Sequence, residues 1–240
     1  MRDMNKIKSA SFFSEEEHAR IRSAVENAEA NTSGEIVIMV VDHSNSYREA
    51  EVLGAVLSAA FCGFLVEIAM QIGSWWFSFY GWSATGTGFD AERVLYGVSL
   101  WTYIPMVIIM FFPLRFVFRK YERLKLSFVG KKRIDEAVRE RAVRAFFEKE
   151  LYRTKGESGI LIFLSLLEHK VWILADRGIN SKIPHDEWNG LARELSLGMR
   201  EKRACAALCS VISSCGEELA RHFPRQSDDT NELEDHVLHH

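Results

Sequence analysis

The stretch that decides the fold is residues 159–179, which read GILIFLSLLEHKVWILADRGI. Two apolar, β-branched runs, Gly159–Leu167 and Val171–Ile179, are joined by the short Glu168-His169-Lys170 segment. This pattern predicts a β-hairpin with His169 in its turn. A third run, Glu35–Asp42, is almost continuously apolar, as in a strand that is buried on both faces. We therefore predict one small mixed sheet that unites strands lying far apart in the chain.

Helices are expected around these strands. Ser14 and Glu17 form the pattern of a capping box at the start of a first helix. Residues Ile134–Tyr152 show helical spacing of apolar positions, and Pro184 suits the start of a further helix. A last helix ends near His222-Phe-Pro224. The order of elements predicts an α/β sandwich with a small mixed sheet.

Two long apolar segments interrupt this domain. Val52–Ile72 carries one charge, Glu67, and Val94–Phe118 carries one, Arg115. A bilayer core about 30 Å thick needs roughly 20 helical residues, and both segments are that long. The alternative, two buried helices of a soluble domain, fits poorly in a chain of this size. We predict a transmembrane hairpin over residues 51–119, with an aromatic-rich outer linker at Gly73–Arg93.

The distribution of basic residues predicts the orientation of this hairpin. The linker contains one basic residue, Arg93, whereas residues 115–133 contain eight: Arg115, Arg119, Lys120, Arg123, Lys125, Lys131, Lys132 and Arg133. Cytoplasmic flanks carry the excess of Lys and Arg. We therefore expect a two-span protein of the cell inner membrane with both termini in the cytoplasm. Residues 1–50 and 120–224 would form one discontinuous cytoplasmic domain, followed by an acidic, mobile tail at 225–240.

Composition excludes several classes of function. The chain has 240 residues and a net charge of −3, so no basic excess points to nucleic acid. Four Cys residues are too few for a disulfide scaffold. Cys205, Cys209 and Cys215 share one apolar helical stripe, which predicts buried thiols without a metal. The sequence contains no P-loop, His-Glu-x-x-His motif or nucleophile elbow.

The order of elements, together with several short motifs, resembles the TPM domain family, in particular a bacterial membrane branch. The matching residues are Gly159–Ser165, Val171–Asn180, Trp188, His222-Phe-Pro224 and Asn231-Glu-Leu233. The resemblance covers roughly residues 10–50 and 120–233. It implies a Rossmann-like α/β/α sandwich tethered to a membrane and a role in the upkeep of membrane protein complexes. One plant branch of the family is linked to acid phosphatase activity.

The strand ends offer a candidate ligand site. If the first and third strands run parallel, Asp42 and Asp176 end at the same edge of the sheet, where ligands of open α/β sheets gather. The two carboxylates could then hold Ca²⁺ or Mg²⁺, with Arg177 on a phosphate oxygen and Asp186 nearby. The alternative is structural: an Asx-turn at Asp42, Asp176 and Arg177 paired with each other or with backbone, and a positive φ at Gly178.

Polar and small residues in the apolar segments also stand out. Glu67 is an intramembrane carboxyl, and Tyr96, Ser99 or Tyr103 could meet it across the hairpin. A ridge of small residues permits close helix approach and could join copies of the chain; it consists of Ala55, Ala59 and Gly63.

Two classes of function remain. The first is a membrane-anchored accessory or binding module that acts on other membrane proteins, which the lack of a complete catalytic set favours. The alternative is a metal-assisted, phosphatase-like hydrolase that uses Asp42 and Asp176.

Overall fold

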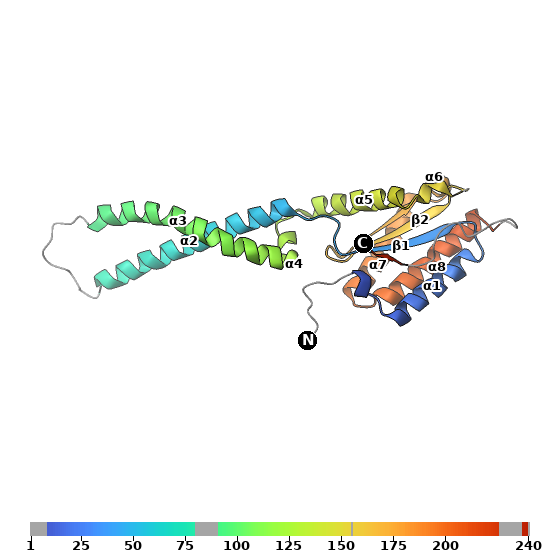
Figure 1. Cartoon of the computed structure of the whole chain (residues 1–240), viewed down its shortest axis with the longest axis horizontal. Helices are drawn as coiled ribbons and strands as arrows, with labels where there is room; N and C mark the ends of the chain where they lie inside the picture. Colours follow the sequence, from blue (N-terminus) through green and yellow to red (C-terminus); the bar gives the residue numbers. More distant parts are fainter. Residues whose placement is uncertain (1–8, 80–90, 155, 226–236, 240) are drawn as a thin grey trace. The chain divides into compact units, whose positions relative to one another are not determined.

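The computed structural model describes residues 9–79, 91–154, 156–225 and 237–239 (Figure 1). The chain divides into two compact units, one formed by Met1–Ser46 with Gly130–His240 and the other by Tyr47–Val129. The first is an α/β unit and the second is a helical hairpin.

A single mixed sheet lies at the centre of the α/β unit. Its strand order is β3-β2-β1-β4, and β1 runs parallel to β2 from the pair Glu35–Gly159 to the pair Val41–Ser165. β2 and β3 pair antiparallel as a hairpin. The strands are β1 (Glu35–Val41), β2 (Gly159–Ser165), β3 (Lys170–Ala175) and β4 (Leu238–His239). The strand before the apolar insertion and the hairpin after it therefore belong to one sheet.

Helices cover both faces of this sheet, which gives a mixed α/β unit with three layers (Figure 1). Ile36, Ile38 and Val40 point to one face and pack in a core with α1, α7 and α8. Their neighbours Val37 and Met39 point to the other face and pack against α5. The helices are α1 (Glu15–Glu29), α5 (Lys131–Glu148), α7 (His185–Arg200) and α8 (Ala204–His222). Burial on both faces explains the continuous apolar run of β1.

Local signals in the sequence account for several element ends. The capping box is confirmed, because Glu17 N–H donates to Ser14 Oγ at 3.2 Å and Ser14 N–H donates to the Glu17 carboxylate at 2.8 Å. His169 lies in the β2–β3 turn with a φ of 50°. After α8, the carbonyl of Phe223 accepts a bond from Thr32 Oγ1 at 2.7 Å, which ties the end of α8 to the start of β1. Short 3₁₀ turns occupy Ser9–Ser11 and Leu151–Arg153.

The structure corrects two predicted features of the α/β unit, the end of the second hairpin strand and the end of the C-terminal tail. The second hairpin strand ends at Ala175 rather than Ile179, because Asp176 caps the short helix α6 (Arg177–Asn180). The end of the predicted mobile tail is ordered, since Leu238–His239 pairs with β1 and the Val237 side chain is only 7% exposed. The free edge of β1 offers the backbone partners that this segment needs. Residues 226–236, including Asn231-Glu-Leu233, lie outside the described part of the chain.

The hairpin unit consists of α2 (Arg48–Phe79), α3 (Ala91–Lys120) and α4 (Glu122–Leu126). The long helices run antiparallel and approach closely, since a Cβ on Gly63 would lie 2.9 Å from the Tyr103 ring. Ala55 and Ala59 are fully buried. The ridge of small residues therefore packs against α3 within the hairpin.

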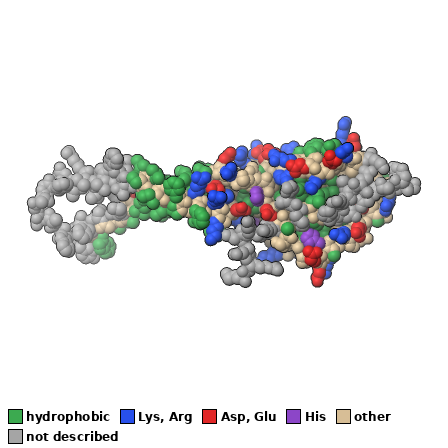
Figure 2. Space-filling view, viewed as in Figure 1, with side chains coloured by type: hydrophobic (Ala, Val, Ile, Leu, Met, Phe, Trp, Pro, Cys, Tyr) green, Lys and Arg blue, Asp and Glu red, His purple; other side chains and the backbone are tan. Residues whose placement is uncertain are grey.

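The hairpin exposes large apolar side chains (Figure 2). One candidate membrane span, Arg48–Ala69, has 22 residues. Its most apolar stretch of 18 residues has a mean hydropathy of 2.2, and only 22% of that stretch is buried. A core helix of a soluble protein would be mostly buried, so this helix is a candidate for contact with lipid. The side chains of residues 91–102, in the first part of α3, lie outside the described part of the chain.

Of the three residues expected to meet Glu67, only Tyr103 has a described side chain. The Tyr103 hydroxyl donates to the carbonyl of Ala60 at 3.2 Å, so it satisfies a backbone group of α2 instead of meeting the carboxyl. Glu67 is half-buried. The side chains of Tyr96 and Ser99 lie outside the described residues. The joining segment is also shorter than predicted, because α2 continues to Phe79 and α3 begins at Ala91.

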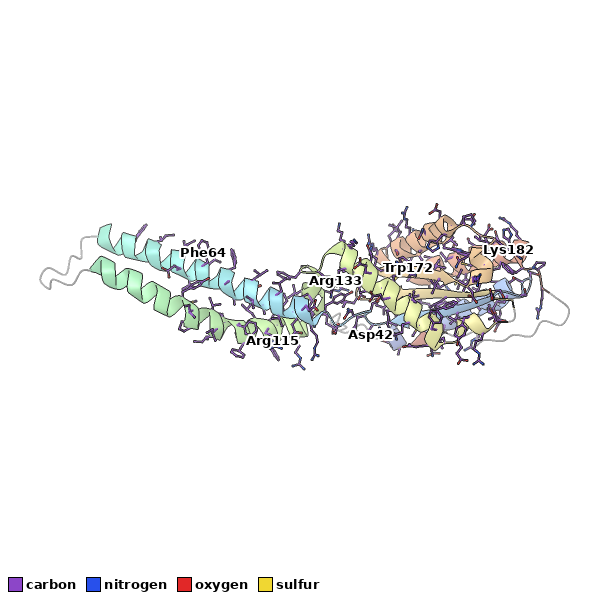
Figure 3. The ribbon with its side chains drawn as sticks, turned by 90° about the horizontal axis from the view of Figure 1, so that it is seen from above. Asp42, Phe64, Arg115, Arg133, Trp172 and Lys182 are labelled. Carbon is purple, nitrogen blue, oxygen red and sulfur yellow. The ribbon has the colours of Figure 1, made fainter. Side chains whose placement is uncertain are left out.

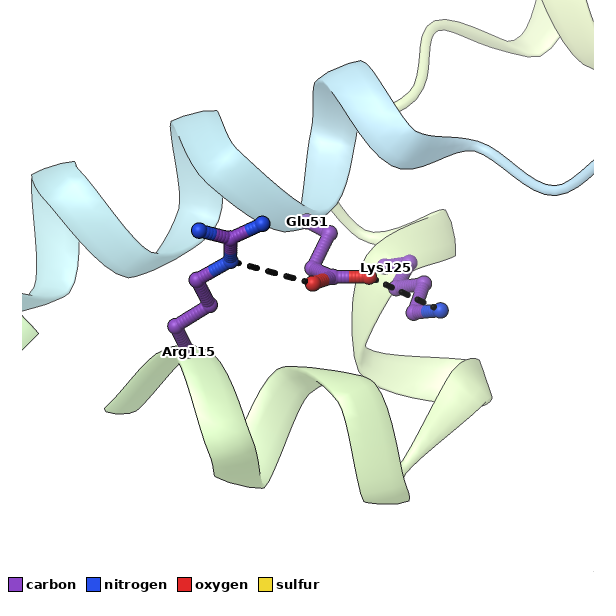
Figure 4. Close-up of polar contacts among 3 residues, drawn as sticks. All are labelled: Glu51, Arg115 and Lys125. Carbon is purple, nitrogen blue, oxygen red and sulfur yellow. Dashed lines mark hydrogen bonds and ion pairs between the residues drawn. The ribbon is translucent and has the colours of Figure 1, made fainter. Parts of the chain in front are cut away.

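An ionic cluster closes the base of the hairpin (Figure 4). Glu51 of α2 contacts Arg115 of α3 at 3.5 Å and Lys125 of α4 at 3.4 Å. The Glu51 and Lys125 side chains are only 12% and 10% exposed. The rings of Phe118 and Phe128 pack edge to face at 5.4 Å beside them. These contacts explain why the hairpin unit extends to residue 129, beyond the predicted boundary at 119.

Candidate binding site

The two predicted acidic ligands lie at opposite ends of the sheet. Asp42 follows β1 at the edge where β2 ends with Ser165. Asp176 follows β3, and its backbone N–H donates to the carbonyl of Gly159, the first residue of β2, at 2.9 Å. Because β3 is antiparallel to β2, the end of β1 that carries Asp42 and the end of β3 that carries Asp176 lie at opposite ends of the sheet. The length of the strands separates them, which is about 20 Å at roughly 3.3 Å per residue. The condition for a shared cation site, parallel first and third strands, is not met.

The other residues of the predicted site have structural roles. Asp42 Oδ1 accepts a bond from the backbone N–H of Ser9. Asp176 Oδ1 accepts one from the backbone N–H of Arg177 at 2.7 Å and so caps α6. A Cβ on Gly178 would lie 2.7 Å from the carbonyl oxygen of Glu157, so a close backbone approach, not a positive φ, requires this glycine. Asp186 lies exposed in the first turn of α7.

A hydrogen-bonded network occupies the carboxyl ends of the parallel strands. Ser44 Oγ donates to Ser165 Oγ at 2.8 Å, and Ser165 Oγ donates to the Glu168 carboxylate at 2.5 Å. The backbone N–H of Ser44 donates to the same carboxylate at 3.0 Å. Sequence reasoning missed this network, although a serine that ends a buried apolar strand was a visible signal. These bonds join the loop after β1 to the loop after β2. Because the polar groups bond to one another, they do not form an open ligand site.

The cysteines are placed largely as predicted. Cys205 and Cys215 are buried, whereas Cys209 is half-buried. Burial raises the pKa of Cys215 to about 12, so this thiol stays protonated and unreactive near neutral pH. In the described part of the chain, no group of three or more His, Cys, Asp or Glu side chains is placed to hold a metal ion.

A groove runs beside the outer edge of β3, between α5 and α7, with a cavity volume of about 520 Å³. Its lining comes from β3 residues 170–173, from Asp135 and Val138 on α5, and from one face of α7. The α7 positions follow helical spacing, as Asn189, Arg193, Leu197 and Arg200. Trp172, labelled in Figure 3, forms part of the wall. Sequence reasoning missed the groove, because its residues converge only in the folded unit.

The groove carries a net positive charge. Lys170 donates to Asp135 at 2.8 Å, which neutralises both side chains. Arg193 and Arg200 are exposed, and neither pairs with an acidic side chain in the described part of the chain. Arginine presents a planar fork of donors that matches a carboxylate. The groove can therefore bind an anionic group beside an apolar one.

Comparison with known proteins identifies the fold alone. No protein-family model and no curated protein matches the sequence. The chain is similar to the BA42 protein from the psychrophilic bacterium Bizionia argentinensis, whose structure was solved by NMR, with 18% sequence identity and a TM-score of 0.52. The likeness covers 95% of each chain.

Proposed function

We propose that this chain is a membrane-anchored, TPM-like binding module that acts on other membrane proteins. The observation that carries the proposal is the groove of about 520 Å³ beside β3, with its two exposed arginines. The upkeep of membrane protein complexes is the role that the TPM resemblance implies. The order α1, β1, insertion, β2–β3, α7, α8 supports that resemblance and a Rossmann-like classification of the sandwich.

The anchor in this proposal is a transmembrane hairpin formed by α2 and α3. Their 32 and 30 residues exceed the roughly 20 that a bilayer core requires. Large side chains such as Phe64 at 55% exposure and Ile109 at 69% exposure point outward. Close packing through Gly63 and Tyr103 satisfies the contact that two spans need with each other.

The orientation in this proposal places both termini in the cytoplasm, beside an inner membrane. It is supported by the eight basic residues at and beyond the C-terminal end of α3, in residues 115–133, against a single Arg93 near its start. These side chains would also attract anionic headgroups, at about 1 kcal/mol per Lys or Arg near the surface. Tethering raises the effective concentration of the α/β unit toward neighbouring membrane proteins.

Photo-crosslinking in living cells tests this function. A photoreactive amino acid would replace one exposed residue at a time in the full chain, at Arg22, Tyr152, Leu197 or Glu217. We expect a membrane protein to be captured reproducibly from at least one position, and alkaline extraction to leave the full chain in the membrane. Release of the chain at alkaline pH, or no reproducible capture from any position, would contradict the proposal.

A phosphatase assay separates this function from the hydrolase alternative. Purified full-length protein with Mg²⁺, Mn²⁺ or Ca²⁺ should show no turnover above background, because the register holds Asp42 and Asp176 apart. Turnover that both Asp42→Asn and Asp176→Asn abolish would favour the hydrolase instead.

A further inference from the structure

The outer edge of β3 presents backbone groups to the groove. In an antiparallel pair, residues alternate between those that bond to the partner strand and those that face away from it. The bond from Asp176 N–H to the Gly159 carbonyl sets this alternation, so Trp172 and Leu174 face β2. Val171 and Ile173 therefore direct their N–H and C=O groups outward.

These outward groups have no backbone partner in the described part of the chain, although their residues are nearly buried. Val171 is 6% exposed and Ile173 is 4% exposed, because α5 and α7 flank the strand. Buried backbone donors and acceptors are almost always satisfied in native proteins. An unpaired edge at the floor of a groove is the arrangement by which sheets accept an additional strand.

The two walls of the groove differ in chemistry. The side chains of Val171 and Ile173 belong to the face that packs on α7, while Trp172 belongs to the face that packs on α5. An added strand would alternate its side chains between the same two faces. The side chains on one face of the added strand would contact Arg193 and Arg200 of α7. Those on its other face would contact the wall of the groove that contains Trp172.

From this juxtaposition we infer that the edge of β3 binds an extended, acidic segment of a partner protein by strand addition. The segment pairs with the backbone of Val171 and Ile173, and its carboxylates bind Arg193 and Arg200. The inference rests on the proposed binding function and names its partner class. About four to six residues of peptide match the length of β3.

Two other occupants are less compatible with the observations. A second copy of the chain paired edge to edge would bring Arg193 and Arg200 close to the same two positive charges of the other copy. The end of the chain's own acidic tail pairs with β1 through Leu238–His239, at the opposite edge of the sheet. An acidic segment from another protein satisfies both the backbone edge and the charge.

Peptide binding tests the inference directly. The probe is a fluorescein-labelled peptide of ten residues that alternates glutamate with valine, added to the full chain in neutral detergent micelles. We expect saturable binding by fluorescence anisotropy that weakens as salt is raised. A peptide with lysine in place of glutamate, and the glutamate peptide with all backbone amides N-methylated, should each bind at least about tenfold more weakly.

Matched variants locate the site. Arg193→Gln combined with Arg200→Gln should weaken binding about tenfold or more, whereas Arg20→Gln combined with Arg22→Gln on α1 removes the same charge and should change it less than about twofold. Equal loss in both variants would reduce the interaction to net charge and overturn the inference.

Hydrogen exchange resolved to single amides tests strand pairing without any substitution. The bound peptide should slow exchange at Val171 and Ile173 at least about tenfold, and should leave Trp172 and Leu174 unchanged because they already face β2. No added protection at Val171 and Ile173 would overturn the inference. So would a dimer by light scattering in which these two amides are already protected without peptide. If a membrane protein is captured from Arg22 or Glu217 and the peptide does not bind, this inference fails while the proposed function stands.

Discussion

The two units of the chain place their apolar side chains in opposite ways. In the α/β unit, Phe163 is fully buried between the sheet and α5. In the hairpin, Phe61 is 60% exposed and Phe112 is 66% exposed. Water-soluble proteins seldom expose a large continuous apolar patch. The α/β unit therefore buries its large apolar side chains in its own core, whereas the hairpin leaves many of its large apolar side chains exposed.

The largest expected effect is an all-or-none difference in labelling across the membrane. With Cys62→Ser as background, a cysteine introduced by Ser83→Cys should react with an impermeant maleimide on intact cells. The control Ser181→Cys, at an exposed site of the α/β unit, should react only after permeabilisation. The reverse pattern would refute the orientation, and labelling of both in intact cells would refute the cytoplasmic placement of the α/β unit.

Truncation of a phenylalanine should have opposite consequences in the two units. Phe163→Ala should lower the free energy of unfolding by about 3–5 kcal/mol, because it removes a fully buried ring and leaves a cavity. Phe112→Ala, on the exposed surface of α3, should change it by less than about 0.5 kcal/mol. Urea unfolding of the full chain in neutral micelles measures both, and similar losses would contradict the distinction between the units.

Within the hairpin, the ionic cluster at its base should matter more than a surface ion pair. Glu51→Gln leaves Lys125 largely buried without its carboxylate and should lower the unfolding free energy by about 3 kcal/mol. The control is Glu136→Gln, whose pair with Lys132 is exposed at 4.0 Å, and it should cost less than about 0.5 kcal/mol. Helix content followed in mixed micelles of increasing SDS content gives both values, and equal stabilities would disprove the role of Glu51.

The effect that is smallest at neutral pH is a pH dependence from the core of the α/β unit. Burial raises the pKa of Cys215 to about 12, above that of an unfolded thiol. The unfolded chain therefore loses this proton first, so the stabilisation is complete below about pH 9 and is lost as the pH rises toward 12. The contribution is at most about 1.4 kcal/mol per pH unit. Cys215→Ala should reduce this slope by up to that amount, whereas the half-buried Cys209→Ala should leave the Cys215 contribution in place. The slope that remains in Cys215→Ala comes from Cys205, whose pKa burial raises to about 11. Unchanged slopes in both variants would contradict the assignment.

The candidate sites show where sequence reasoning stops. Asp42 and Asp176 were correctly placed at strand ends, yet their separation depends on the direction of β3, which pairing with β2 decides. The groove draws on residues that are up to 65 positions apart, from Asp135 to Arg200. No local sequence pattern predicts that these residues line one groove, because their proximity follows from how α5 and α7 pack on the two faces of the sheet.

The sequence by itself determined the elements whose signals are local. Continuous apolar runs identified β1 and β2, a capping box identified the start of α1, and long uncharged segments identified α2 and α3. Each signal reflects the surroundings of consecutive residues. Only the tertiary structure decided that β3 lies at an open edge and that the ridge at Ala55 packs inside the hairpin. Both outcomes depend on which surfaces pack together. The burial of apolar surface between elements far apart in the chain decides this packing.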